Sequence, residues 1–160
     1  MIKTFVAIIL LGVCVPVGAQ ENYSLSECSD NQRKKGLGER LRITVPKGSP
    51  TEKGGGGHYW TYDVGFGKKN FRVWMDGIFG YVATSGKVPK YMLSETVFSN
   101  RTWSFQETEG VDVKGRLGNG NYWRYLGTFG ESIKYFDVPK DAADFFDIIL
   151  DGVCYNPPKP

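Results

Sequence analysis

The chain contains a single histidine, His58, which limits the catalytic chemistry that the sequence can support. A zinc site with two histidine ligands cannot be built within one chain, and a Ser-His-Asp triad would have to use this residue. His58 follows the four glycines 54–57, whereas a general base must be held within hydrogen-bond reach of its nucleophile. We therefore expect a solvated loop histidine, no metal site and no catalytic triad.

Two acidic residues, Glu107 and Glu109, have a spacing that suggests hydrolytic chemistry. On one strand face their side chains would point the same way, roughly 7 Å apart. Such a separation suits the carboxylate pair of a glycosidase. A small sheet, however, rarely provides the deep cleft that these enzymes need. A small secreted hydrolase that uses Glu107 and Glu109, or His58, is therefore kept as an alternative function.

Two glycine-rich stretches, 65–70 and 115–120, do not match phosphate-binding loops. GFGKKN lacks the required glycine spacing and the Ser or Thr after its lysine, and GRLGNG is typical of a hairpin turn. We therefore expect no cofactor. The net charge of +3 comes without a clustered basic face, so the sequence also predicts no nucleic-acid partner.

Aromatic residues make up 14% of the chain and concentrate in the expected strands, several of which carry them on both faces. One face of the sheet must form the core, and the other would expose aromatic side chains. Exposed aromatic patches can mark contacts with sugars, peptides or proteins. The candidate contact residues are Trp60, Trp74, Trp123 and Arg124. The alternative is that the helix and loops cover the second face.

Alternation with a period of two predicts strands in most of the chain after residue 39. The expected strands are 40–45, 59–66, 71–75, 78–83, 101–107, 111–117, 121–127 and 131–138. Asp76-Gly77 and Asn119-Gly120 lie between apolar runs and predict hairpin turns. Residues 20–38 are expected to be irregular, and residues 46–57 to form a mobile loop.

One amphipathic helix is predicted near the C-terminus, over residues 139–151. Ala142, Phe145 and Ile149 recur at three- and four-residue spacing, and Gly152 supplies a stop signal. Hairpin-connected strands pair antiparallel. The predicted fold is therefore α+β: an antiparallel meander of about 6–8 strands with the helix packed on one face.

The first 19 residues match the pattern of a cleavable signal peptide. Lys3 precedes an apolar run, and the small residues Val17 and Ala19 predict cleavage before Gln20. The run is shorter than the roughly 20 residues of a transmembrane helix. Residues 20–160 are thus expected to form a single secreted or periplasmic domain with a Pro-rich C-terminal tail and no transmembrane segment. An uncleaved membrane anchor and lipid attachment at Cys14 are the alternatives.

Cys28 and Cys154 are the cysteines that remain after cleavage. Export brings them into an oxidising compartment, and two cysteines allow one intramolecular pairing. We therefore predict a Cys28–Cys154 disulfide that joins the end of the helix to the start of the exported domain. Asn22-Tyr-Ser and Asn100-Arg-Thr fit the acceptor pattern for N-glycosylation.

These observations favour an exported, non-enzymatic binding or envelope-associated domain. It would hold a protein or carbohydrate partner on an aromatic-rich sheet face. Besides the hydrolase, a structural protein without a ligand is the third interpretation.

Overall fold

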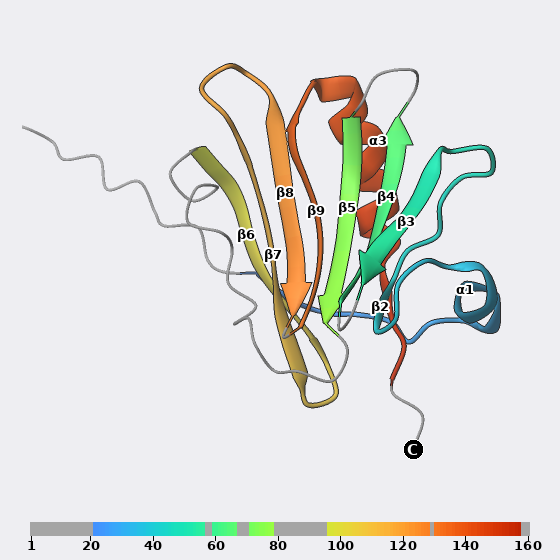
Figure 1. Ribbon diagram of the computed structural model, residues 1–160. Coiled ribbons are helices and arrows are strands. Elements are labelled where there is room, and N and C mark those ends of the chain that lie inside the picture. The colour runs from blue at the N-terminus through green and yellow to red at the C-terminus, as the bar shows by residue number, and fades with distance from the viewer. Residues whose placement is uncertain (1–20, 57–58, 67–70, 79–95, 129, 158–160) are drawn as a thin grey trace, which may run out of the picture.

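The computed structural model describes residues 21–56, 59–66, 71–78, 96–128 and 130–157, with the backbone alone for Gly56, Tyr59 and 71–78. Its main sheet has eight strands in the order β1-β6-β7-β8-β9-β5-β4-β3 (Figure 1). All neighbouring strands are antiparallel except β1 and β6. The strands are β1 (Glu21–Ser24), β3 (Thr51–Gly56), β4 (Tyr59–Phe66), β5 (Phe71–Ile78), β6 (Thr96–Phe105), β7 (Thr108–Arg116), β8 (Tyr122–Thr128) and β9 (Glu131–Val138).

A second sheet pairs β2 (Leu41–Arg42) with β10 (Cys154–Tyr155), and the helices are α1 (Asp30–Lys35) and α3 (Lys140–Asp151). The predicted α+β class, with an antiparallel sheet and a C-terminal helix, is confirmed. Within the described part of the chain, no helix is long and apolar enough to cross a membrane.

The sheet consists of two meanders, β3–β4–β5 and β6–β7–β8–β9, which join where β5 pairs with β9. Asn119-Gly120 lies in the turn between β7 and β8, as predicted. The prediction of a hairpin turn at Asp76-Gly77 is wrong. Both residues lie inside β5 and pair with β4 on one side and β9 on the other. Because β5 has a neighbour on each side, pairing extends through a dipeptide that would otherwise favour a turn.

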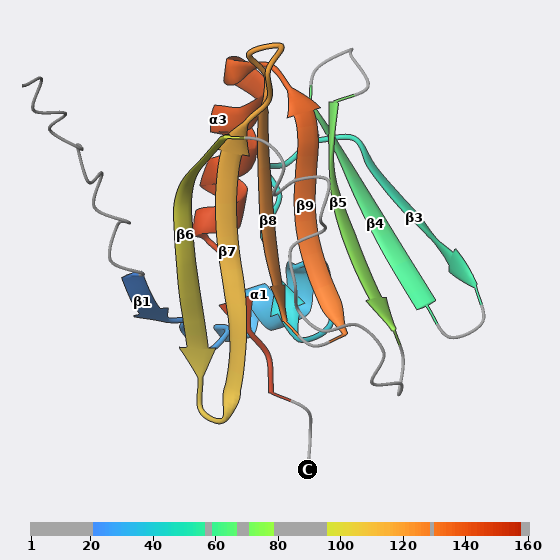
Figure 2. The same ribbon diagram turned by 90° about the vertical axis from the view of Figure 1, so that its left-hand side faces the viewer.

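Helix α3 covers one face of the sheet by packing on β8 and β9 (Figure 2). Its buried residues are Ala142, Ala143, Phe146, Ile149 and Leu150. They meet apolar side chains from β4, β6, β8 and β9: Trp60, Val64, Trp103, Leu126, Ile133, Tyr135 and Val138. Burial of this helix stripe against the apolar sheet face is the main source of stability, as in other α+β folds.

The opposite face carries a smaller apolar cluster centred on Trp123, with Val113 and Tyr125. The indole of Trp123 lies against Gly115, its partner in the β7–β8 register. Trp103 lies against Gly110 in the same way across the β6–β7 pair. Glycine allows these close approaches because any side chain there would overlap the aromatic ring.

The segment expected to be irregular, residues 20–38, contains β1 and α1. Helix α1 begins after a capping box in which Ser29 and Gln32 satisfy each other's backbone N–H groups. The expectation of a mobile loop over 46–57 is also wrong in part. Thr51–Gly56 forms the edge strand β3, whose backbone pairs with β4 despite its glycines.

Candidate functional site

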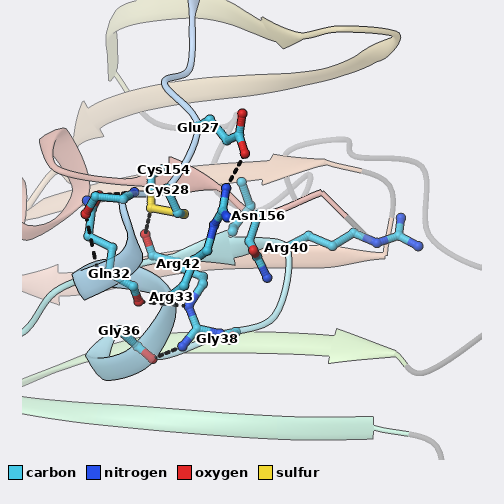
Figure 3. Close-up of a disulfide and its surroundings, with 12 residues drawn as sticks. Glu27, Cys28, Gln32, Arg33, Gly36, Gly38, Arg40, Arg42, Cys154 and Asn156 are labelled. Atoms are coloured by element: carbon cyan, nitrogen blue, oxygen red, sulfur yellow. Dashed lines mark hydrogen bonds and ion pairs between the residues drawn. A yellow bond between two sulfur atoms is a disulfide. The ribbon is translucent and has the colours of Figure 1, made fainter. Parts of the chain in front are cut away.

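The predicted disulfide is present: Cys28 and Cys154 are bonded, with their Cα atoms 5.0 Å apart (Figure 3). Both residues are buried. Backbone hydrogen bonds strengthen the same junction, because Cys28 N donates to Tyr155 O and Tyr155 N donates to Ser26 O, each at 2.9 Å. The end of α3 and the start of the domain are therefore joined covalently and by hydrogen bonds.

Arg42 lies beside the disulfide, and its guanidinium holds the C-terminal end of α1 (Figure 3). Nε donates to the carbonyl of Gln32 at 3.1 Å, and Nη1 donates to that of Gly38 at 2.7 Å. Nη2 donates to the carbonyl of Gly36. The carbonyl of Gln32 also accepts from Gly36 N at 2.8 Å, so Arg42 adds a second donor to this helix end and binds two carbonyls of the segment that follows it. Arg42 is thus a structural residue and is not available to a ligand.

A buried carboxylate, Glu131, attaches the start of β9 to the segment that leads into β2. Oε2 accepts from Leu41 N at 2.7 Å, and the carboxylate also accepts from Arg40 N at 3.0 and 3.1 Å. Burial raises the pKa of Glu131 to about 7, although these backbone N–H groups act in the opposite direction. The group therefore titrates near neutral pH.

The most charged part of the interior is an ion-pair network beneath α3. Arg124 on β8 and Asp112 on β7, each 1% exposed, form two parallel hydrogen bonds of 2.8 and 2.9 Å. Arg101 on β6 forms a second ion pair with Asp112, and the hydroxyl of Tyr23 on β1 donates to the same carboxylate at 3.1 Å. The guanidinium of Arg101 lies 4.7 Å from the centre of the Tyr23 ring. Four neighbouring strands thus contribute to one polar cluster.

Helix α3 joins this network through acidic side chains on its sheet-facing side. Asp147 Oδ1 accepts from Arg124 Nη1 at 3.0 Å and from the hydroxyl of Tyr135 at 2.9 Å. Asp151 also pairs with Arg124 at 2.8 Å, and Lys114 lies 3.4 Å from Asp147. The network therefore fixes the position of α3 on the sheet.

The pKa values of three groups in this network, Asp112, Tyr23 and Tyr135, are moved away from neutral pH. Burial would raise the pKa of Asp112, but the hydrogen bonds and charges of Arg124 and Arg101 lower it overall. Burial and the neighbouring aspartates raise the phenol pKa values of Tyr23 and Tyr135 above their usual range. A general acid or base works best with a pKa near the operating pH. These groups are therefore suited to a structural role.

Three of the four predicted contact residues lie in the interior. Trp60 belongs to the core beneath α3, Trp123 to the cluster on the opposite face, and Arg124 to the ion-pair network. Trp74 lies in β5, but its side chain is outside the described residues. The structure thus brings no two of these side chains together on a surface. Alternation alone could not show that the second face has its own buried cluster.

The candidate hydrolytic residues do not share a strand. Glu107 lies in the two-residue turn between β6 and β7, whereas Glu109 is on β7, and both are exposed. The expectation that they project from one strand face is therefore wrong. His58 lies outside the described residues. Among those that are described, no group of three or more His, Cys, Asp or Glu side chains could hold a metal ion.

An aromatic surface does occur at the end of the sheet where β6 begins, in a place that the sequence patterns did not indicate. Phe98 is 53% exposed, and its ring lies 6.3 Å from that of Tyr122 in an edge-to-face contact. The cations of Arg116 and Lys140 lie 5.7 and 5.9 Å from the centre of the Tyr122 ring. We call these four residues the Tyr122 patch.

Comparison with known proteins gives no relative: no protein-family model, curated protein or solved structure matches the chain. The fold and site define the class only as an α+β domain with a buried disulfide and an ion-paired interior.

Proposed function

We propose that this chain is an exported, non-enzymatic binding domain that holds a protein or carbohydrate partner on the Tyr122 patch. The observation that carries the proposal is an exposed aromatic side chain that contacts a second ring with two cations beside it. Among the described residues, three large hydrophobic side chains are exposed, and the aromatic one, Phe98, contacts the ring of Tyr122 in this patch. Soluble proteins tolerate scattered exposed apolar residues, whereas grouped ones mark contact surfaces.

The chemistry of the patch suits recognition. Aromatic side chains and arginine are enriched at the centres of protein interfaces, where they supply large apolar areas together with hydrogen-bond donors. Arg116 Nε donates to the carbonyl of Gly120 at 3.1 Å, which orients the guanidinium beside the Tyr122 ring. Orientation before binding reduces the entropy lost when a partner is held.

Export is supported by the signal-peptide pattern of residues 1–19 and by the buried disulfide. Strand β1 begins at Glu21, so cleavage after Ala19 would remove no residue of the sheet. The proposal predicts that protein recovered outside the cytoplasm begins at Gln20. N-terminal sequencing of that fraction tests this, and a chain that keeps Met1 and stays in the cytoplasm would contradict it.

Binding can be tested by photo-crosslinking in the native host. A benzophenone amino acid replaces Phe98 in one variant and Ile148 in a matched control. Ile148 is even more exposed, at 74%, but lies on the outer side of α3. We expect a discrete adduct, to protein or glycan, from position 98 and none from position 148.

The adducted partner is then purified and its affinity measured. Phe98→Ser should weaken binding at least tenfold, as removal of a central aromatic contact does, and Ile148→Ser should not change it. Equal adducts from both positions, or no adduct from position 98, would leave the structural protein without a ligand as the better interpretation.

A further inference from the structure

A cavity of about 390 Å³ lies at the opposite edge of α3 from the ion-pair network, and neither that network nor the Tyr122 patch uses it. It is open to solvent, and three elements line it: the loop after β2, the end of β4, and α3. The lining residues are Lys47, Gly48, Ser49, Pro50, Gly65, Phe66 and Phe145. Its volume lies within the roughly 300–1,000 Å³ of small-molecule sites.

The inner wall of the cavity is aromatic. The rings of Phe66 and Phe145 are 5.0 Å apart at 41°, and Phe66 also meets the buried Phe146 edge-on at 6.2 Å. Phe145 is therefore held between a strand and the helix core. Together with the ring of Pro50, these side chains give a flat apolar group a surface to stack on.

The outer wall is a hydrogen-bonded turn. Ser49 N donates to Pro46 O at 3.1 Å, and Gly48 has the positive φ of +89° that this turn requires. Gly65 N donates to Pro50 O at 2.8 Å, which attaches the turn to β4. These bonds shape the turn and hold it against β4, which fixes the outer wall of the cavity.

One charged side chain lies at this cavity. Lys47 occupies the corner of the turn, and in the described part of the chain it has no carboxylate partner. The acid next to Phe145, Asp144, is paired with Lys140 at 2.6 Å. Ser49 adds a hydroxyl to the same rim. The combination of aromatic wall, single cation and hydroxyl is complementary to a flat apolar body that carries one negative charge.

We propose that this cavity binds a small aromatic carboxylate. The ring stacks against Phe66 and Phe145, and the carboxylate lies between the Lys47 ammonium and the Ser49 hydroxyl. This site shares no residue with the Tyr122 patch, so the proposal does not depend on whether that patch binds a macromolecular partner.

The test uses naphthoate as the probe and calorimetry on the purified protein. Naphthoate should bind at millimolar concentration or below. Lys47→Gln should weaken it about fivefold, the upper effect of losing one solvent-exposed ion pair. Phe145→Leu, which keeps apolar bulk but removes the ring, should weaken it by a similar factor. Lys34→Gln, which removes an exposed lysine of α1, serves as the control and should change nothing.

Naphthalenemethanol has the same ring system without the charge, so it distinguishes the stacking of the ring from the contact between the carboxylate and Lys47. It should bind more weakly than naphthoate, and Lys47→Gln should not change its affinity. Any of three results would overturn the proposal: no binding of naphthoate at millimolar concentration, an unchanged affinity in both Lys47→Gln and Phe145→Leu, or an equal loss in Lys34→Gln.

Discussion

Replacing Asp112 with asparagine tests whether the ion-pair network stabilises the sheet. Asparagine has nearly the same volume, so the change leaves no cavity, and one carbonyl oxygen remains as an acceptor. The lost negative charge faces Arg124 and Arg101. Arg124 is 1% exposed and cannot regain its hydration without unfolding.

Removing one partner of a buried ion pair costs about 3–5 kcal/mol, because the other charge is left uncompensated. Asp147 and Asp151 still face Arg124 in the variant, so we expect the lower end of that range. A loss of about 3 kcal/mol is a large share of the 5–15 kcal/mol of free energy of unfolding that is typical of a domain.

Urea denaturation, followed by tryptophan fluorescence, measures this loss because Trp103 and Trp123 are buried in the folded state. Glu109→Gln removes an exposed acid from the same strand and is the control, with an expected change within about 0.5 kcal/mol. A loss below about 1 kcal/mol in Asp112→Asn would refute the stabilising role.

Three further predictions concern titration, the disulfide and the glycine contacts. Because the pKa of Glu131 rises from 4.5 to about 7 on folding, its stabilising contribution is complete below pH 4.5 and is lost as the pH rises to 7. The free energy of unfolding should fall by about 3 kcal/mol across this window in the wild type relative to Glu131→Gln, and parallel pH profiles would contradict this. Reduction of the disulfide should lower the free energy of unfolding by about 2–5 kcal/mol, with the far-ultraviolet circular dichroism at low temperature unchanged; an unaltered melting temperature would argue against the bond. Gly115→Ala would place a Cβ 2.6 Å from the Trp123 ring and should destabilise by about 1–3 kcal/mol in chemical denaturation. Gly118→Ala has open space around the new Cβ and should change stability by less than about 0.5 kcal/mol, so equal effects would refute the contact.

Much of the secondary structure follows from local pattern. The range predicted for β9, 131–138, matches its observed bounds, and the predicted helix 139–151 differs from α3 by one residue. Strand β4 likewise spans its predicted residues, 59–66. These predictions succeed because each segment carries its own hydrophobic period, two residues in the strands and about 3.6 in the helix, which gives it one apolar face.

Other elements depend on partners that local pattern does not contain. The glycines of β3 are paired because β4 lies beside them, and Asp76-Gly77 stays extended because β5 has two neighbours. Helix α1 has a local signal, the Ser29–Gln32 capping box, which a search for S-x-x-Q would have found.

Among the candidate site residues, the sequence singled out Arg124 but did not show that it lies in a buried ion-pair network. Its partner Asp112 lies diagonally across the β7–β8 pair, two positions from the residue directly opposite. Register sets that relation, and register is a property of the two strands together. The Tyr122 patch and the Phe66–Phe145 cavity also combine residues from several separate elements.

The sequence by itself determined the class of fold, the C-terminal helix and the cysteine pairing, because period, length and the count of thiols suffice for each. Only the tertiary structure decided that β5 joins β9, that Trp60, Trp123 and Arg124 are buried, and which aromatic rings remain at the surface. The physical reason is that alternation assigns a side chain to a face of its strand. What covers that face is decided by strand order and by the docking of α3.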